Sequence, residues 1–112
     1  MTTTYSPSIV GSSHPAAGDT QSLAVIAVNS NAYVNVHIAN TSVDHIDYVR
    51  VAVRQSGNNF DNNCYIAYDT AVLPEGMFVL PNIGLGPQDQ ILVYSRLGYC
   101  SFNVIGSRFF NF

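Results

Sequence analysis

The residues best suited to bind a metal or transfer a proton lie in the segment Asp44-His45-Ile46-Asp47. His37, on the predicted strand before this segment, is a further candidate. Side chains alternate along an extended segment, so His45 and Asp47 would lie on one side of it. Imidazole and carboxylate groups bind metals, and a cation held by these two residues with His37 or Asp44 is one interpretation. The other is a turn in which Asp44 caps backbone N–H groups and the histidines stay solvated. We favour the turn, and predict neither a metal nor a cofactor.

The remaining reactive residues fit no catalytic template. The chain has no Gly-rich phosphate loop after a strand and no nucleophile elbow, and its carboxylates are spread singly through turns. We therefore predict a protein without enzymatic activity. Cys64 and Cys100 are too few for a disulfide scaffold and match no zinc spacing. The two cysteines could form a disulfide bond between neighbouring strands, or they could be buried thiols that act as small apolar side chains. We favour the buried thiols.

Composition narrows the function further. The chain has 112 residues, which indicates one domain, and only 10% of them are charged. It contains no Lys, and its four basic residues are Arg50, Arg54, Arg96 and Arg108. A net charge of −3 argues against a nucleic-acid partner, because phosphate contacts require a basic face. No apolar run is long enough to span a bilayer and the first residues lack a secretory signal, so we expect neither a membrane protein nor export by the general route.

Apolar residues alternate in two segments that read as half-buried strands. In Tyr33 to Asn40, one face carries Val34, Val36 and Ile38. In Tyr48 to Arg54, the valines point inward and the other face carries Tyr48, Arg50, Ala52 and Arg54. One wet face is typical of antiparallel sheets. The predicted core partners of these stripes are Ile66, Phe78, Leu80, Ile91, Val93, Phe102 and Val104.

Further apolar runs separated by Gly, Pro and Asn turns bring the expected total to about seven or eight short strands. The fold class predicted is all-β, a single antiparallel β-sandwich of jelly-roll or Ig-like type. Residues 1–21 are rich in Thr, Ser, Pro and Gly, and we expect an extended N-terminal arm there, with room for one short edge strand. Residues 22–112 form the predicted β-sandwich domain.

Aromatic residues are the main candidates for binding. Seven Tyr and six Phe do not all fit inside one small core, and exposed Tyr favours interfaces or stacking on sugar rings. The C-terminus holds three Phe in its last four residues, and these either complete the core or are buried by another subunit. We favour burial in an assembly. The predicted interface residues are Tyr5, Ile9, Val10, Phe60, Arg108, Phe109, Phe110 and Phe112.

Several strand and turn sequences follow one another between residues 32 and 106. They are Asn40-Thr41-Ser42, Val49-Arg50-Val51-Ala52-Val53, Tyr65-Ile66-Ala67-Tyr68-Asp69, Leu73-Pro74, Leu85-Gly86-Pro87-Gln88-Asp89-Gln90-Ile91 and Ser101-Phe102-Asn103-Val104-Ile105-Gly106. In this order they resemble small β-sandwich virion structural proteins of tailed bacteriophages, particularly phages of cyanobacteria. The segment before Ser22 and the Phe-rich end after Gly106 depart from that pattern.

The resemblance implies a capsid decoration (cement) protein that docks in multiple copies on the lattice of the major capsid protein. A homo-oligomer, preferably a trimer, fits such a lattice, and the protein would be made in the host cytoplasm and reside in the virion. A tail, neck or fibre component is the alternative within this class, and a carbohydrate-binding receptor module is the alternative outside it. A glycan binder should gather its exposed Tyr in one groove, whereas a cement protein should spread them over flat contacts.

Overall fold

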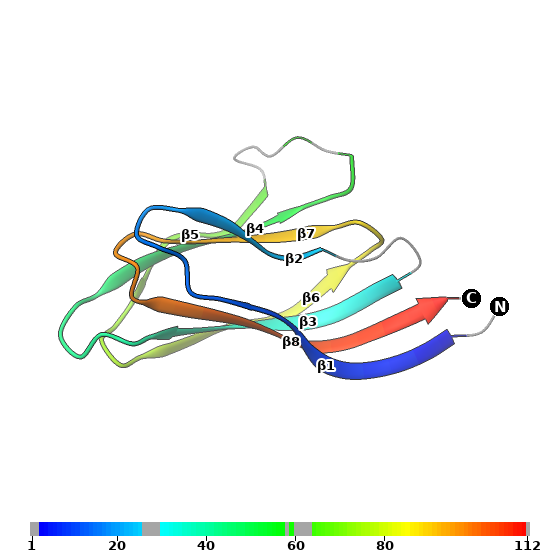
Figure 1. Cartoon of the computed structure of the whole chain (residues 1–112), viewed down its shortest axis with the longest axis horizontal. Helices are drawn as coiled ribbons and strands as arrows, with labels where there is room; N and C mark the ends of the chain where they lie inside the picture. The colour runs from blue at the N-terminus through cyan, green and yellow to red at the C-terminus, as the bar shows by residue number, and fades with distance from the viewer. Residues whose placement is uncertain (1–2, 26–29, 58, 60–63, 112) are drawn as a thin grey trace.

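The protein is a β-sandwich of two four-stranded antiparallel sheets (Figure 1). The computed structural model describes residues 3–25, 30–57, 59 and 64–111, with side chains for 11–23, 31–57, 59 and 64–107. The strands of this described part are β1 (Thr3–Ser13), β2 (Thr20–Val25), β3 (Ser30–Asn40), β4 (Asp47–Arg54), β5 (Tyr65–Val72), β6 (Met77–Leu85), β7 (Gln90–Ser95) and β8 (Cys100–Asn111).

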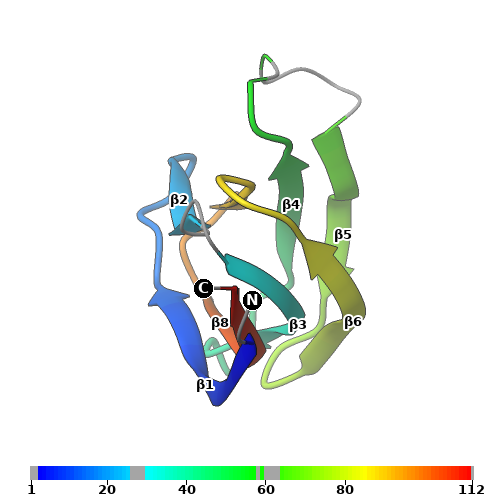
Figure 2. The same ribbon diagram turned by 90° about the vertical axis from the view of Figure 1, so that its right-hand side faces the viewer.

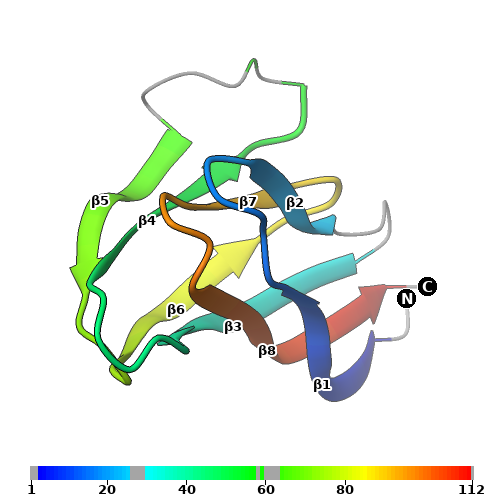
Figure 3. The same cartoon turned by 60° about the vertical axis from the view of Figure 1, so that its left-hand side comes forward.

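The order of the strands identifies the type of sandwich. One sheet runs β1-β8-β3-β6 and the other β2-β7-β4-β5, and the two lie as separate layers (Figure 3). This order, in which β1 and β2 belong to different sheets, is that of a jelly roll built from two Greek keys. An Ig-like sandwich would instead pair its first two strands in one sheet. The topology therefore decides between the two types that the sequence left open.

The core lies between the inward faces of the sheets. Val34, Val36 and Ile38 of β3 are fully buried, as are Val49 and Val51 of β4. The predicted partners on the neighbouring strands, Ile91 and Val93 of β7 beside β4 and Phe102 and Val104 of β8 beside β3, are also buried. Val53, Phe78 and Leu80 pack at the margin. Each fully buried side chain of this size contributes roughly 1.5–3 kcal/mol of transfer free energy. The alternation in the sequence located this core correctly.

Two core positions differ from the prediction, Ile66 in β5 and Ala52 in the neighbouring strand β4. Ile66 is 45% exposed, and Ala67 takes the inward place instead. The reason is a bulge: Val51 pairs with Ala67 and Ala52 with Tyr65, which leaves Ile66 as an extra residue without a register partner on β4. A second bulge follows along β5, because Val49 pairs with Thr70 and two residues, Tyr68 and Asp69, therefore oppose Arg50. Ala52, predicted to face water, is buried between its register partners Leu92 and Tyr65, whose side chains are longer than its methyl group.

The chain ends meet along one sheet. β1 pairs with β8 over Thr3–Ser13, so the backbone of the predicted arm forms an edge strand there, and the start of β1 and the end of β8 lie side by side (Figure 2). β8 continues past Gly106 and pairs with β3 as far as Phe110. Prolines occur in both edge strands of this sheet, Pro7 in β1 and Pro81 at a register shift of β6, where a missing N–H costs little.

Candidate interaction faces

The predicted interface residues come from both ends of the chain, and the fold places several of them side by side. In the register of β1 and β8, Tyr5 pairs with Phe109 and Ser6 with Arg108, and Phe110 pairs with Thr4. Ile9 pairs with Ile105, just before a register shift that spans Val10. Phe60 and Phe112 lie outside the described residues. That the eight predicted residues form one interface stays a prediction.

The β1-β8-β3-β6 sheet carries almost no charge. Its four strands contain a single Asp, Glu, Lys or Arg residue, Arg108. We call its outward side the uncharged face, and its members with described side chains include Tyr33, Asn35, His37, Met77, Val79, Asn103 and Ile105. Tyr33 is 65% exposed and Ile105 40% exposed, on neighbouring strands. Depletion of charge around exposed aromatic and aliphatic side chains is the composition of an interface centre.

The opposite sheet presents a different surface, which we call the arginine–tyrosine face. Its members, from β4, β5 and β7 and the turn after β7, are Tyr48, Arg50, Arg54, Tyr65, Tyr68, Asp69, Tyr94 and Arg96. Antiparallel pairing sets Arg50 opposite Tyr94. The guanidinium carbon of Arg50 lies 4.2 Å from the ring centroid of Tyr68 and 4.5 Å from that of Tyr94. One cation is thus held against two rings, a geometry of favourable cation–π contacts.

Asp69 links the two arginines of this face. Arg50 donates from Nε to Oδ1 at 2.7 Å and from Nη2 to Oδ2 at 3.3 Å, and Arg96 Nη2 lies 3.2 Å from Oδ2. Arg96 also covers the ring of Tyr48, with its guanidinium carbon 4.5 Å from the centroid. The hydrogen bonds from Arg50 hold the pKa of Asp69 below its ordinary value and raise that of Arg50. A carboxylate held in its ionised form this way is a poor general base at neutral pH.

The bulge at Tyr68 and Asp69 in β5 explains how the carboxylate of Asp69 comes to lie between the two arginines. Asp69 has a φ of 49°, in the left-handed region that Asp adopts more readily than most residues. Next to it, Tyr68 packs edge-on against Tyr65, with ring centroids 4.9 Å apart. The alternation in the sequence placed Tyr48, Arg50 and Arg54 outward, but periodicity carries no signal for a bulge. It therefore missed the contribution of β5 to the face.

Asp47, which the disfavoured metal interpretation included as a ligand, is a buried acceptor that shapes the turn between β7 and β8. Its Oδ1 accepts from the backbone N–H groups of Tyr48 at 2.8 Å and Leu97 at 2.9 Å. Its Oδ2 accepts from Tyr99 N–H at 3.1 Å and from the hydroxyl of Ser95. Burial alone would raise the pKa of Asp47, but these hydrogen bonds outweigh it and the pKa is lowered. By fixing this turn, Asp47 also positions Arg96.

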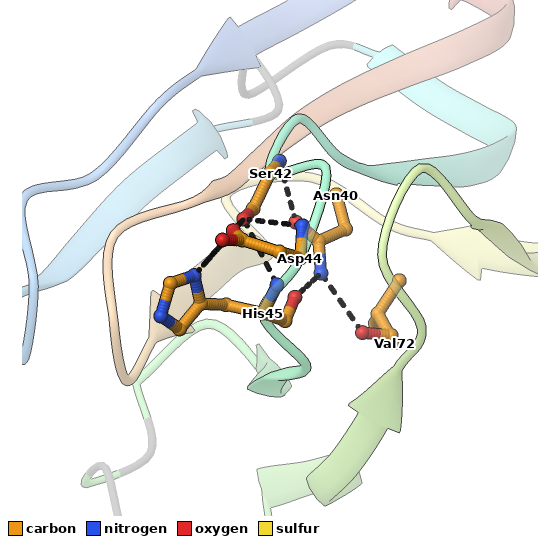
Figure 4. Close-up of polar contacts among 5 residues, drawn as sticks. All are labelled: Asn40, Ser42, Asp44, His45 and Val72. Carbon is orange, nitrogen blue, oxygen red and sulfur yellow. Dashed lines mark hydrogen bonds and ion pairs between the residues drawn. The ribbon is translucent and has the colours of Figure 1, made fainter.

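The neighbouring residues Asp44 and His45 form a corner closed by hydrogen bonds (Figure 4). His45 Nδ1 lies 2.7 Å from Asp44 Oδ1, while Ser42 Oγ accepts the backbone N–H groups of Asp44 and His45 at 3.3 and 3.1 Å. Asn40 Nδ2 donates to the carbonyls of His45 at 2.8 Å and Val72 at 2.9 Å. The hydrogen bond with His45 lowers the pKa of Asp44.

The side chains of Asn40 and Ser42 therefore hold the backbone of this corner in place. The ring of His45 stacks on Tyr99, with centroids 5.3 Å apart. In the described part of the chain no three His, Cys, Asp or Glu side chains come together as a metal site would require. The capping differs from the expectation, because Ser42 Oγ and not the carboxylate of Asp44 accepts the backbone N–H groups, and Asp44 instead contacts His45.

The two cysteines are free thiols in the described structure, so the alternative of a bridge is not realised. Cys100 is fully buried, and burial raises the pKa of its thiol to about 12. Cys64 is partly buried, with Sγ 3.8 Å from the carbonyl oxygen of Asn59. Cys100 thus acts as a small apolar side chain.

A depression of about 400 Å³ lies beside the β1–β8 pair, lined by Ser12, Ser13, His14, Ser101, Phe102 and Asn103. His14 is the one imidazole or carboxylate among these lining residues, and its Nε2 lies 2.8 Å from the carbonyl oxygen of Gly98. Because no second acid or base accompanies it there, the depression offers no acid–base pair. Within the described residues there is also no helix long and apolar enough to cross a membrane.

The chain matches no protein-family model and no curated protein. Among solved structures, a chain of the infectious bursal disease virus Gx strain is similar, with a TM-score of 0.47 and 17% sequence identity. The similarity covers 97% of the present chain but 33% of the viral one, so this chain spans one third of that chain's length. Similarity at this level bears on neither family nor function.

Proposed function

We propose that this chain is a non-enzymatic structural protein of a phage particle, a capsid decoration protein that docks in multiple copies on the major capsid protein. The observation that carries the proposal is the uncharged face. An exposed sheet surface whose described side chains include no Asp, Glu, Lys or Arg is unusual, because these four residue types make up roughly 25–35% of a typical soluble surface. A surface of this composition is suited to burial against another protein.

Two further observations support a structural role. The jelly-roll topology occurs in viral capsid domains, although the fold also hosts lectins, and this support is by analogy. The hydrogen-bond networks around Asp47 and Asp44 bind backbone N–H groups, so their role in the structure is to stabilise turns. The resemblance of the strand and turn sequences to phage virion proteins points the same way.

Docking in multiple copies fits a small face. Repeated weak contacts on a symmetric lattice gain strength through multivalency, and closed rotational symmetry is the common way for such copies to associate. We propose a homo-oligomer, with a trimer preferred, in which the paired ends of β1 and β8 contribute. Native mass spectrometry of the full chain measures this state, and a monomer at all accessible concentrations would contradict it.

A charge placed on the uncharged face tests the docking. Ile105→Lys should weaken attachment to particles that lack the protein by at least about tenfold, because an unpaired ammonium would be buried. The matched control is Ile66→Lys, since Ile66 is 45% exposed and Ile105 40% exposed, on opposite sheets. Co-sedimentation with particles of the virus that encodes the chain measures binding.

Equal binding by the two variants would overturn the assignment of this face, and failure of the unaltered protein to sediment with particles would overturn the capsid role. Electron microscopy of labelled particles separates the lattice from the tail, neck or fibre. Label confined to the tail would favour the alternative of a tail component.

A further inference from the structure

The arginine–tyrosine face carries a row of cations along β4. Arg50 and Arg54 both point outward from this strand and are four residues apart, so their Cα atoms are about 13 Å apart at 3.3–3.4 Å per residue. Arg96 extends the row past Arg50, since its backbone N–H donates to the carbonyl of Tyr48 at 2.9 Å. This face thus holds three of the four arginines, with Asp69 as the one acidic residue among its members, in a chain of net charge −3.

The ion pairs within the face leave much of this charge available. Asp69 engages Arg50 through two hydrogen bonds, but the described contact with Arg96 uses one guanidinium nitrogen. Among the described residues no carboxylate lies within ion-pair distance of Arg54. A guanidinium has five N–H donors in a fork that matches a carboxylate, so Arg96 and Arg54 can each hold a further anion.

Aromatic rings flank the row. Tyr48, Tyr65, Tyr68 and Tyr94 gather on this one face, and Tyr68 is 55% exposed although Arg50 packs against its ring. Of these four only Tyr68 is well exposed, and its ring offers a surface for a sugar, because pyranose rings present apolar C–H faces that stack on aromatic side chains. A peptide of acidic residues alone would satisfy the arginines but offers no such C–H face.

We propose that the arginine–tyrosine face binds a linear acidic polysaccharide, a polymer of uronic acids. Its carboxylates, repeated along the chain, pair with Arg96 and Arg54, and a sugar ring between them packs on Tyr68. Such a site would let the protein hold a particle near an acidic glycan surface. It is separate from the uncharged face on the other sheet, so it stands or falls independently of docking to the capsid.

Polygalacturonate with a fluorescent label is the probe, titrated with the full chain at low salt and followed by anisotropy. Arg54→Gln and Arg96→Gln should each weaken binding about tenfold through loss of a charge-assisted pair. Arg108→Gln removes the same charge from β8 of the other sheet and should bind within about twofold of the unaltered chain. Tyr68→Ala should weaken binding, whereas Tyr33→Ala, which removes an exposed Tyr from the other sheet, should not.

Dextran and poly-L-glutamate separate the possible occupants. Neutral dextran should not bind, and poly-L-glutamate should bind more weakly than polygalacturonate and show no loss with Tyr68→Ala. Equal loss in Arg108→Gln would mean that net charge alone attracts the polymer, and would overturn the site. Tighter binding of poly-L-glutamate would assign the face to an acidic protein instead, and no binding of polygalacturonate would also refute the proposal. Melting curves of each variant establish that it is folded.

Discussion

At the scale of single residues, Asp47 is the side chain on which most local geometry depends. Its two carboxylate oxygens accept from four donors, so Asp47→Asn would turn an NH₂ group toward donors on one side. We expect unfolding in urea to show a loss of about 3 kcal/mol at pH 7, typical of a broken network around a buried charge. Asp44→Asn, at an exposed corner, should stay close to the unaltered protein, and equal losses in the two variants would contradict this account.

Asp47 should also make the stability of the fold depend on pH. The folded-state pKa of Asp47 lies below its ordinary value of 3.8, so its contribution is present above that value and is lost as pH falls through the folded pKa. Stability of the unaltered chain should therefore decline in the acid range below about pH 4, with Asp69 and Asp44 adding to the decline in the same direction. The decline should be smaller in Asp47→Asn, and equal slopes would show that other groups cause it.

At the scale of strands, the close contact of β3 and β8 depends on Gly106. A Cβ atom there would lie 2.2 Å from the carbonyl oxygen of Tyr33 and 2.7 Å from Cα of Val34, both backbone atoms that cannot move aside alone. Gly106→Ala should therefore lower the melting temperature by roughly 10 °C or more, by separating the two strands. Gly86→Ala, whose Cβ would meet Asp89 Oδ2 at 3.6 Å, should melt near the unaltered chain. A similar melting temperature for both variants would contradict this view of the pairing.

At the scale of the whole molecule, the two sheets divide the charge. The outer side of β1-β8-β3-β6 has no described charged residue, while β4 and its neighbours carry most of the arginines. Attachment to particles should thus change little between about 0.05 and 0.5 M salt, whereas binding of polygalacturonate should fall steeply. Sedimentation and anisotropy over one salt series measure both, and release from particles by moderate salt alone would argue against docking through the uncharged face.

Most strands and the inward stripes of β3 and β4 can be predicted from the sequence, because alternation along a strand is a local property that any sheet must obey. The 11-residue β1 strand is expected from the sequence only as an arm with room for a short edge strand. The sequence also placed Arg50 and Arg54 on one outward face. Only the tertiary structure decided the jelly-roll order, the burial of Asp47 and the gathering of Tyr68, Asp69, Tyr94 and Arg96 around Arg50. These depend on which strands pair and on a bulge in β5 that shifts the alternation, and pairing across long separations leaves no periodic mark in the chain.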